Sequence, residues 1–277
     1  MVYRFLHSLL LRSIVGRHMR KFKLKKPPIA ERWVLFEFDP NSNKTAWEGR
    51  QANELAESLK TQFPSRKFVW AQEFQITQAG PGEPIQPLFR NRLEAVRCEN
   101  ESTTEIFQIR DDQITFHQLC KKDRWPGFAK FIDRAIELLG VYTEAFAPIR
   151  IKGARLHDLD VIEIPMNTGP VHLDQYFTLM KDLPETPFGF IHGFSSQYLT
   201  LAPHDNEPFV VSLQQMPAAD GVLRFHVDRD KQCSKLDASS METLRSSLTM
   251  NHDFMLECFE AAFRQTECWM LFDPEDD

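Results

Sequence analysis

The stretches RWVLFEF (residues 32–38) and IRIKGARLHDLDVIEI (residues 149–164) decide the fold class that the sequence predicts. Both are rich in aromatic and branched residues, which favours β-strands. Each is followed by a helical pattern, by several further strand patterns and by a second helical pattern. We therefore expect an α+β protein made of two β-α-β(3-4)-α units, with a mainly antiparallel sheet and helices packed on one face. Because the two halves share little residue identity, the predicted duplication depends on the order of elements.

The other predicted elements follow from hydrophobic periodicity and from turn residues. Helices are expected over about residues 45–62, 126–139, 168–183 and 239–264. Further strands are expected at 67–77, 89–98, 188–201, 209–215 and 222–228, with a hairpin over 104–119. Ser239 and Glu242 have the spacing of a capping box, in which each side chain bonds the backbone amide of the other, so they predict the start of the last helix.

The expected units cover residues 27–145 and 146–265 and are flanked by tails of opposite charge. An acidic tail covers residues 266–277, and a basic extension covers residues 1–26. The extension contains no acid and eight cations, namely Arg4, Arg12, Arg17, Arg20, Lys21, Lys23, Lys25 and Lys26. The remaining residues therefore hold 25 cations against 39 acids. This acidic body argues against broad non-specific DNA binding, which needs a basic surface.

The basic extension has two further interpretations. Met19 offers an alternative start, after which the chain runs directly into the first strand, so we expect residues 1–18 to be a frayed or wrongly assigned extension. The apolar run at Phe5–Leu11 is too short to span a bilayer and is not followed by a good cleavage site. In the alternative interpretation, residues 1–26 form a basic amphipathic helix that binds nucleic acid or a membrane surface.

Cysteine usage points to a reducing compartment. The five cysteines are odd in number and widely spaced, and no CxxC pair occurs among Cys98, Cys120, Cys233, Cys258 and Cys268. A secreted disulfide scaffold and a cysteine-based zinc site are both disfavoured by this pattern. We therefore expect reduced thiols and a cytoplasmic location.

The segment RFHVDRD (residues 224–230) is the best candidate for chemistry. Alternate side chains of a strand point to the same face, which brings together one imidazole and two carboxylates, those of His226, Asp228 and Asp230. Such a set could bind a divalent metal if other segments supplied further ligands. The simpler interpretation is that these residues are the solvent-facing positions of a half-buried strand, whose Phe225 and Val227 face the core.

A second candidate is His157, which stands among carboxylates that include Asp160 and could act as a general base. No GxSxG, HExxH or P-loop motif accompanies it, so catalysis at His157 would have no recognisable nucleophile. His252 falls on the apolar stripe of the last predicted helix. A histidine at such a position is usually a hydrogen-bonded core or interface residue.

Three short motifs resemble those of a known family. The first is Lys26-Pro27-Pro28-Ile29, at the entry to the first strand. The second is a box at residues 151–158, in which Gly153 and Arg155 match an Arg-x-Gly-Leu-Arg-Tyr-Ile-Asn-like pattern while its Tyr-Ile-Asn portion is replaced. The third is a pair seven residues apart, His252 and Phe259. Over roughly residues 19–265, the chain is similar to a sporadically distributed, largely uncharacterised family of bacterial and archaeal proteins.

This resemblance implies no established activity. The scatter of the family across genomes suggests mobile or defence-linked gene neighbourhoods, which would suit a protein that binds a partner. Gly153 and Arg155 are then architectural, because glycine allows close backbone approach and arginine pairs with a buried carboxylate or carbonyl. His252 and Phe259 are likewise expected to be structural.

We therefore expect a non-enzymatic, cytoplasmic interaction module that needs no cofactor. It would bind a protein partner, or a second copy of itself, through the sheet face or the last helix. The first alternative is a metal-dependent enzyme that acts on nucleotide or nucleic-acid phosphates through His226, Asp228 and Asp230, assisted by His157 or Asp160. The second alternative is nucleic-acid or membrane-surface binding through residues 1–26.

Overall fold

The computed structural model describes residues 24–39, 50–77, 86–120, 125–148, 150–166, 171–178, 195–218, 220–236, 238–263 and 266–273. Within these ranges the strands are β1 (Ile29–Asp39), β2 (Ser65–Thr77), β3 (Gln86–Glu99), β4 (Glu105–Ile109), β5 (Gln113–Leu119), β6 (Arg150–Pro165), β7 (Ser195–Leu201), β8 (Pro208–Gln215) and β9 (Val222–Cys233). The helices are α2 (Arg50–Ser58), α3 (Phe128–Phe146), α4 (Leu173–Tyr176), α5 (Met241–Phe263) and α6 (Glu267–Leu271). Most of the basic extension, residues 188–194 of the strand predicted at 188–201, and the last residues of the acidic tail lie outside the described residues.

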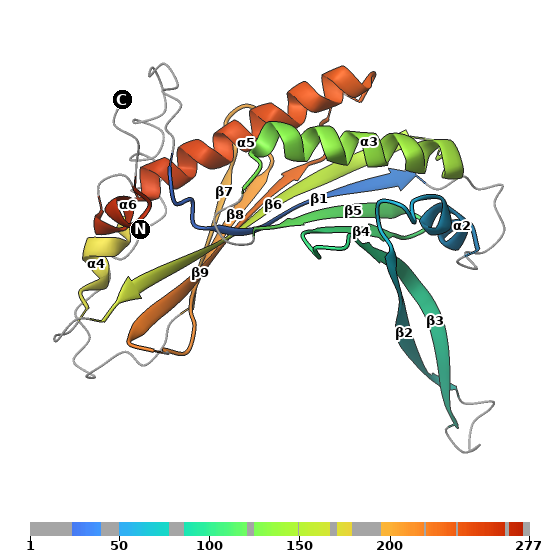
Figure 1. Cartoon of the computed structure of the whole chain (residues 1–277), viewed down its shortest axis with the longest axis horizontal. Coiled ribbons are helices and arrows are strands. Elements are labelled where there is room, and N and C mark those ends of the chain that lie inside the picture. The colour runs from blue at the N-terminus through green and yellow to red at the C-terminus, as the bar shows by residue number, and fades with distance from the viewer. Residues whose placement is uncertain are drawn as a thin grey trace. The chain divides into compact units, whose positions relative to one another are not determined.

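The strands form one nine-stranded sheet in the order β2-β3-β4-β5-β1-β6-β9-β8-β7 (Figure 1). The pairs whose register is known are antiparallel. The predicted α+β class and antiparallel sheet are therefore confirmed. A series of strand, helix, strands and helix occurs twice along the chain, with β2–β5 after α2 and β7–β9 after α4. The duplication itself stays a prediction.

Contacts divide the chain into two compact units, each drawn from separate stretches of sequence. Unit 1 contains residues 1–32, 120–129 and 155–277, and unit 2 contains residues 33–119 and 130–154. Both β1 and β6 begin in one unit and end in the other. This division differs from the expected units 27–145 and 146–265, because contacts within a sheet follow strand neighbours and not chain order alone.

In unit 2, α3 packs through an apolar stripe that continues beyond the predicted helix end, as far as Phe146. Tyr142 is fully buried and stacks on Phe38 of β1, with ring centroids 4.7 Å apart, and on Phe146 at 4.5 Å. Its hydroxyl donates to the carbonyl of Asp111 at 3.0 Å, in the turn between β4 and β5. One side chain therefore joins the helix, a strand and a hairpin turn of unit 2.

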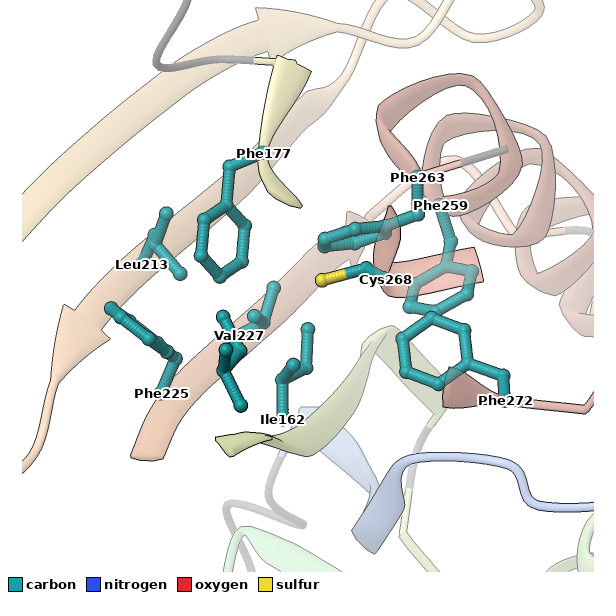
Figure 2. Packing of buried hydrophobic residues seen from close by; sticks show 10 residues of the cluster. Ile162, Phe177, Leu213, Phe225, Val227, Phe259, Phe263, Cys268 and Phe272 are labelled. Atoms are coloured by element: carbon teal, nitrogen blue, oxygen red, sulfur yellow. The ribbon is translucent and has the colours of Figure 1, made fainter. Parts of the chain in front are cut away.

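In unit 1, aromatic side chains fill the core where β6, β8 and β9 meet the C-terminal half of α5 (Figure 2). Phe225 is fully buried and meets Phe177 edge-on, with centroids 4.9 Å apart. Phe177 also meets Phe263 of α5 at 5.9 Å. Helix α4 ends at Tyr176, because Phe177 takes an extended conformation and enters this core. The prediction of one helix over residues 168–183 is therefore wrong at Phe177.

Helix α5 begins at a capping box one residue later than predicted. The backbone amide of Thr243 donates to Oγ of Ser240 at 3.1 Å, and the amide of Ser240 donates to Oγ1 of Thr243 at 3.0 Å. Two amides at the helix start are satisfied in this way. The predicted pair of Ser239 and Glu242 is therefore wrong by one position, whereas the predicted helix over residues 239–264 is confirmed as Met241–Phe263.

Side-chain alternation in β6 and β9 gives unit 1 two different faces. On the side against which α5 packs, here called the helix face, Leu156 and Ile162 of β6 and Phe225 and Val227 of β9 are buried. The opposite side is here called the open face, and its side chains from the same strands are half-buried or exposed. Charged residues occur on both faces, so a residue's place in the alternation decides whether its charge is solvated.

Replacing Phe225 by alanine should destabilise the protein by about 3–5 kcal/mol, because a large buried ring would leave a cavity among other rings. Urea unfolding followed by tryptophan fluorescence measures this loss. Met270→Ala is the matched control, since Met270 is 72% exposed and its truncation should change stability by less than about 0.5 kcal/mol. Equal stability of the two variants would contradict the packing in Figure 2.

Candidate functional site

On the open face of unit 1, a histidine lies between two carboxylates. Nε2 of His157 on β6 is 3.3 Å from Oδ1 of Asp228 on β9, and its Nδ1 is 3.4 Å from Oδ2 of Asp230. Nε of Arg155 donates to both carboxylate oxygens of Asp230, at 2.6 and 2.8 Å. The sequence-predicted residues Arg155, His157, Asp228 and Asp230 thus form one cluster, here called the open-face cluster.

The electrostatics of the open-face cluster favour a charged imidazole. Burial lowers the pKa of His157, but hydrogen bonds and charges from Asp228 and Asp230 outweigh burial and raise the pKa to about 9. Burial also raises the pKa of Asp230, yet its bonds to His157 and Arg155 bring the net shift downward. At neutral pH the cluster therefore holds two cations and two carboxylates. A protonated imidazole can neither accept a proton as a general base nor ligate a metal.

The metal trio predicted from β9 is divided differently by the structure. Asp228 and Asp230 are the ion-pair partners of His157, and His226 lies on the same face of β9, opposite Gln214 of β8. In the described part of the chain, no group of three or more His, Cys, Asp or Glu side chains is arranged to hold a metal ion. The alternation that placed Phe225 and Val227 in the core is present, since both are buried.

Asp160, the other weak catalytic candidate in this segment, does not lie beside His157 in the structure. Residues of opposite parity in a strand point to opposite faces, and Asp160 lies on the helix face, where it is 1% exposed. Nε of Arg229 donates to Oδ2 of Asp160 at 2.8 Å. Burial raises the pKa of Asp160, and the charge of Arg229 opposes that shift. Asp160 therefore belongs to a buried ion pair and not to a solvent-accessible catalytic pair.

A second charged group, which sequence reasoning did not single out, lies on the helix face around Asp158. This carboxylate is 1% exposed and lies between two guanidinium groups. Arg32 of β1 donates to both of its oxygens, the Nη2 bond measuring 2.7 Å, and Nη2 of Arg229 is 3.1 Å from Oδ2. The charges of Arg32 and Arg229 hold the pKa of Asp158 well below its usual range, although burial acts in the opposite direction. We call Arg32, Asp158, Asp160 and Arg229 the buried quartet.

The buried quartet is enclosed by aromatic rings and by α5. The guanidinium carbon of Arg32 lies 4.8 Å from the ring centroid of Trp125, and that of Arg229 lies 4.8 Å from that of Phe259. Nη1 of Arg229 also donates to the carbonyl of Met255 in α5 at 3.2 Å. Cation–π contacts of this kind partly replace lost hydration. Phe259, predicted to be structural, therefore supports a buried charge as well as the apolar core.

His252, also predicted to be structural, is a buried neutral side chain. Its ring stacks on Phe128 with centroids 3.7 Å apart and planes 8° apart. Burial and then the charge of Arg32 lower the pKa of His252 to about 4, although Asp253 and Asp158 oppose them. Its Nε2 has no hydrogen-bond partner in the part of the chain that the structure describes. At neutral pH the ring is therefore an uncharged packing element.

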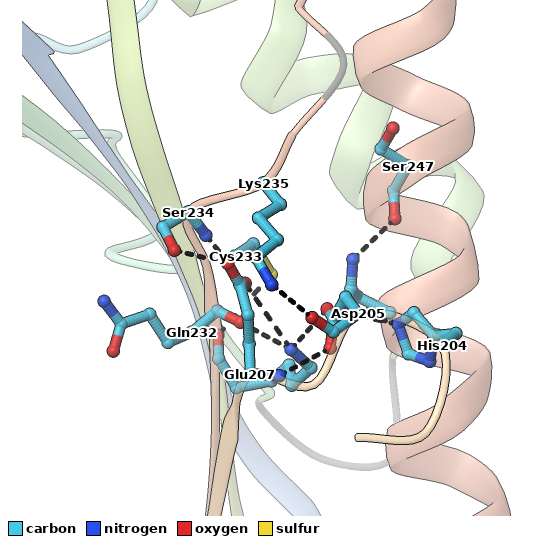
Figure 3. A network of polar contacts seen from close by, with 10 residues as sticks. His204, Asp205, Glu207, Gln232, Cys233, Ser234, Lys235 and Ser247 are labelled. Carbon is cyan, nitrogen blue, oxygen red and sulfur yellow. Dashed lines mark hydrogen bonds and ion pairs between the residues drawn. The ribbon is translucent and has the colours of Figure 1, made fainter. Parts of the chain in front are cut away.

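A further cation, Lys231, is fully buried at the end of β9. Its Nζ donates to Oδ2 of Asp205 at 2.7 Å and lies 3.8 Å from Oε2 of Glu207. Glu207 accepts a bond from the backbone amide of Ser234 at 2.8 Å (Figure 3). These contacts fix the turn between β7 and β8 against the end of β9. Lys231 falls on the same side of the alternation along β9 as the buried Phe225 and Val227. That alternation is the signal that could have identified Lys231 as a buried cation from the sequence.

Beside this turn, the surface of α5 carries a groove with a volume of about 560 Å³. Pro203 and His204 line it together with residues of α5. Nε2 of His204 is 3.0 Å from Oδ1 of Asn251, a contact that fixes His204 to the helix. The α5 residues that line the groove are Arg245, Ser246, Thr249, Met250, Asp253, Phe254 and Glu257.

Strand β7 is the last strand in the sheet order and pairs with β8. Leu199 and Leu201 are 62% and 47% exposed. Register places Leu199 opposite Val210 of β8, and Val210 opposite Asp230 of β9, so the exposed leucines share a face with the open-face cluster.

No protein-family model and no curated protein matches the chain. Membership of the family indicated by Gly153, Arg155, His252 and Phe259 therefore stays a prediction. In the structure, Gly153 is buried in β6 and Arg155 bonds a half-buried carboxylate. None of the helices in the described ranges is long and apolar enough to cross a membrane.

Stability should fall as pH rises from about 6.5 to about 9, because the folded state keeps the His157 proton that the unfolded chain releases. The stabilisation is complete below about pH 6.5 and amounts to at most about 3 kcal/mol. Urea unfolding at several pH values measures the slope. His157→Gln should lose this part of the slope, whereas His172→Gln, at an exposed position, should keep it. Equal slopes would contradict a charged His157.

Asp158→Asn should lower the free energy of unfolding by about 3–5 kcal/mol, because it leaves Arg32 and Arg229 with too little negative charge in a buried place. Asp174→Asn is the control, since Asp174 is exposed and should contribute less than about 0.5 kcal/mol. Chemical denaturation of both variants at pH 7 tests the difference. A loss below about 1 kcal/mol in Asp158→Asn would show that the quartet is less tightly coupled than its geometry indicates.

Proposed function

We propose that the chain is a non-enzymatic protein-interaction module that binds its partner along β7 and the adjoining open face of unit 1. The observation that carries this proposal is the chemistry of β7, which ends the sheet and exposes two leucines. An edge strand can accept an additional strand from a partner, whose backbone then completes the hydrogen-bond ladder.

The sequence of β7 supports such pairing. Edge strands of soluble proteins are usually protected by lysine, proline, a bulge or inward-pointing charge. β7 reads SSQYLTL and contains neither a charged residue nor a proline, and its register with β8 is regular from Ser195 to Leu201. Among the described strands, β8 is the only neighbour of β7. The strand therefore has the composition of a binding edge.

The open face next to β7 could add specificity. Leu199 and Val210 form an apolar strip across β7 and β8, and the strip leads to Asp230 of the open-face cluster. Arg155 is 53% exposed and Asp228 is 37% exposed, so a partner could contact charges of both signs. Because the cluster is internally neutral, the partner would meet fixed dipoles and not a strong net charge.

The same geometry gives little support to the enzymatic alternative. His157 is charged at neutral pH, Asp160 lies on the other face, and His226 is not part of the open-face cluster. The alternative of nucleic-acid or membrane binding rests on residues 1–26, of which residues 1–23 lie outside the described part of the chain. The cytoplasmic location and the link to mobile or defence gene neighbourhoods belong to this proposal and rest on sequence alone.

Affinity capture of the tagged chain from its native host, with quantitative mass spectrometry, tests the proposal. The double variant Leu199→Lys/Leu201→Lys should capture at least about tenfold less partner than the wild type, since two desolvated charges would oppose strand addition. The control is Met270→Lys on α6, where the side chain is 72% exposed. Thermal unfolding must show that both variants are folded.

Direct binding of the recovered partner to the purified chain should show the same difference. Recovery of a second, differently tagged copy of the chain would identify the homodimer expected from sequence. Equal capture by the β7 variant and its control would refute the proposed surface, and capture of nothing by the wild type would refute the interaction module.

A further inference from the structure

The groove on α5 of unit 1 is lined by both apolar and charged side chains. Residues on a helix that differ by four positions form a row along its surface. One such row contains Met250, which is 50% exposed, and Phe254. A parallel row runs from Arg245 through Thr249 and Asp253 to Glu257. The positive end of the groove therefore lies toward the start of α5, and the acidic end lies toward its C-terminus.

The acidic end has an excess of negative charge. Burial, and after it the neighbouring carboxylates of Asp253 and Glu260, raise the pKa of Glu257, while His204 opposes them. Nδ1 of His252 is 3.6 Å from Oδ1 of Asp253, but this ring is uncharged at neutral pH. The last turn of α5 carries no basic residue, although helix C-termini favour cations. A cationic group that entered this end would relieve the crowding of like charges.

The chain itself supplies cations close to that end. Leu24 packs against the core cluster that contains Phe259 and Phe263, in the last two turns of α5. The amides of Lys25 and Lys26 are fixed by bonds of 3.0 Å to the carbonyls of Asp273 and Phe272. Leu24, to which residues 1–23 are attached, therefore lies near the C-terminal end of α5, and Glu257 is the groove residue nearest to that end of the helix.

Residues 1–23 match the groove in charge, in polarity and in length. They contain no acid and six cations, and their apolar residues fall mainly at positions 5–15. The three cations nearest the point of attachment are Arg20, Lys21 and Lys23. The groove extends from residue 245 to residue 257 of α5, or about 18 Å at the helical rise. A segment of this length covers at least about 34 Å in any regular conformation, so it can reach the whole groove.

We propose that residues 4–23 dock in cis along this groove. Arg20, Lys21 and Lys23 face Asp253 and Glu257, and the apolar residues nearer the N-terminus cover Met250 and Phe254. The docked segment neutralises the acidic end of α5 and hides its own cations. An anionic surface that binds the basic segment then has to compete with unit 1 for it. This contact is independent of β7 and of the function proposed for it.

Carbodiimide cross-linking of the full chain, followed by mass spectrometry, tests the contact directly, because the reagent joins amines and carboxylates that already touch. Links from Lys21 or Lys23 to Asp253 or Glu257 are expected, and they should weaken in 0.5 M salt. A mixture of isotopically light and heavy chains distinguishes the origin of the links. Links within one isotope support docking in cis, whereas mixed-isotope links, or links only to carboxylates outside the groove, overturn it.

Trypsin accessibility of the full chain gives a second readout. The variant Asp253→Asn/Glu257→Gln should be cleaved within residues 4–23 about fivefold faster than the wild type, since two close ion pairs are lost. The matched control is Glu144→Gln/Glu242→Gln, which removes two exposed helix carboxylates that do not line the groove. The control should be cleaved at the wild-type rate. Equal cleavage rates for all three chains, with all three folded by thermal unfolding, would refute the docking.

Discussion

The interaction on which unit 1 depends is the pairing of Asp158 with Arg32 and Arg229. Ions that leave water lose several kcal/mol of hydration each, and only close partners of opposite charge can compensate. The buried quartet meets this condition with two guanidinium groups and two carboxylates, and it joins the start of β1 to β6, β9 and a carbonyl of α5. The two guanidinium groups hold Asp158 charged, and Arg229 opposes the effect of burial on Asp160. The quartet therefore tolerates little change of register, and it favours a unique arrangement of these elements more than it favours high stability.

Because side chains alternate along a strand, the charged residues of one segment of β6 lie in two different environments. Residues 155–160 of β6 direct Arg155 and His157 to the open face, and they direct Asp158 and Asp160 to the helix face. On the open face the charges form ion pairs that are half-buried or exposed. On the helix face the same side-chain types are enclosed by Trp125, Phe259 and α5. The chemistry of each residue thus follows from strand parity and not from residue type alone.

Much of the fold could be predicted from the sequence, because periodicity and turn residues are local signals. The order of the elements up to α5, the antiparallel sheet and the extent of α5 follow from such signals. The end of α4 does not, since Phe177 leaves the helix to pack on Phe225, which is distant in sequence. Helix α6 was not predicted, because residues 266–277 were expected to be a tail. The alternation of side chains along β9 predicted that Asp228 and Asp230 share one face. Only the structure shows that His157 of β6 lies between them, because strand pairing is not a local signal. The quartet was missed because aspartate and arginine on a strand suggest solvent, although Asp158 shares parity with Leu156 and Ile162.

The sharing of β1 between two units has a consequence for synthesis on the ribosome. Unit 2 is complete once residue 154 has been made, and it contains the second part of β1. Arg32, in the first part, precedes Asp158 by 126 residues, and Arg229 follows Asp160 by 69. At roughly 5–20 residues per second, Arg32 waits about 6–25 s for its first carboxylate. Arg32 is therefore made long before its carboxylate partner, so its guanidinium group stays hydrated until β6 has been synthesised, and the ion pairs on which unit 1 depends form only late in synthesis.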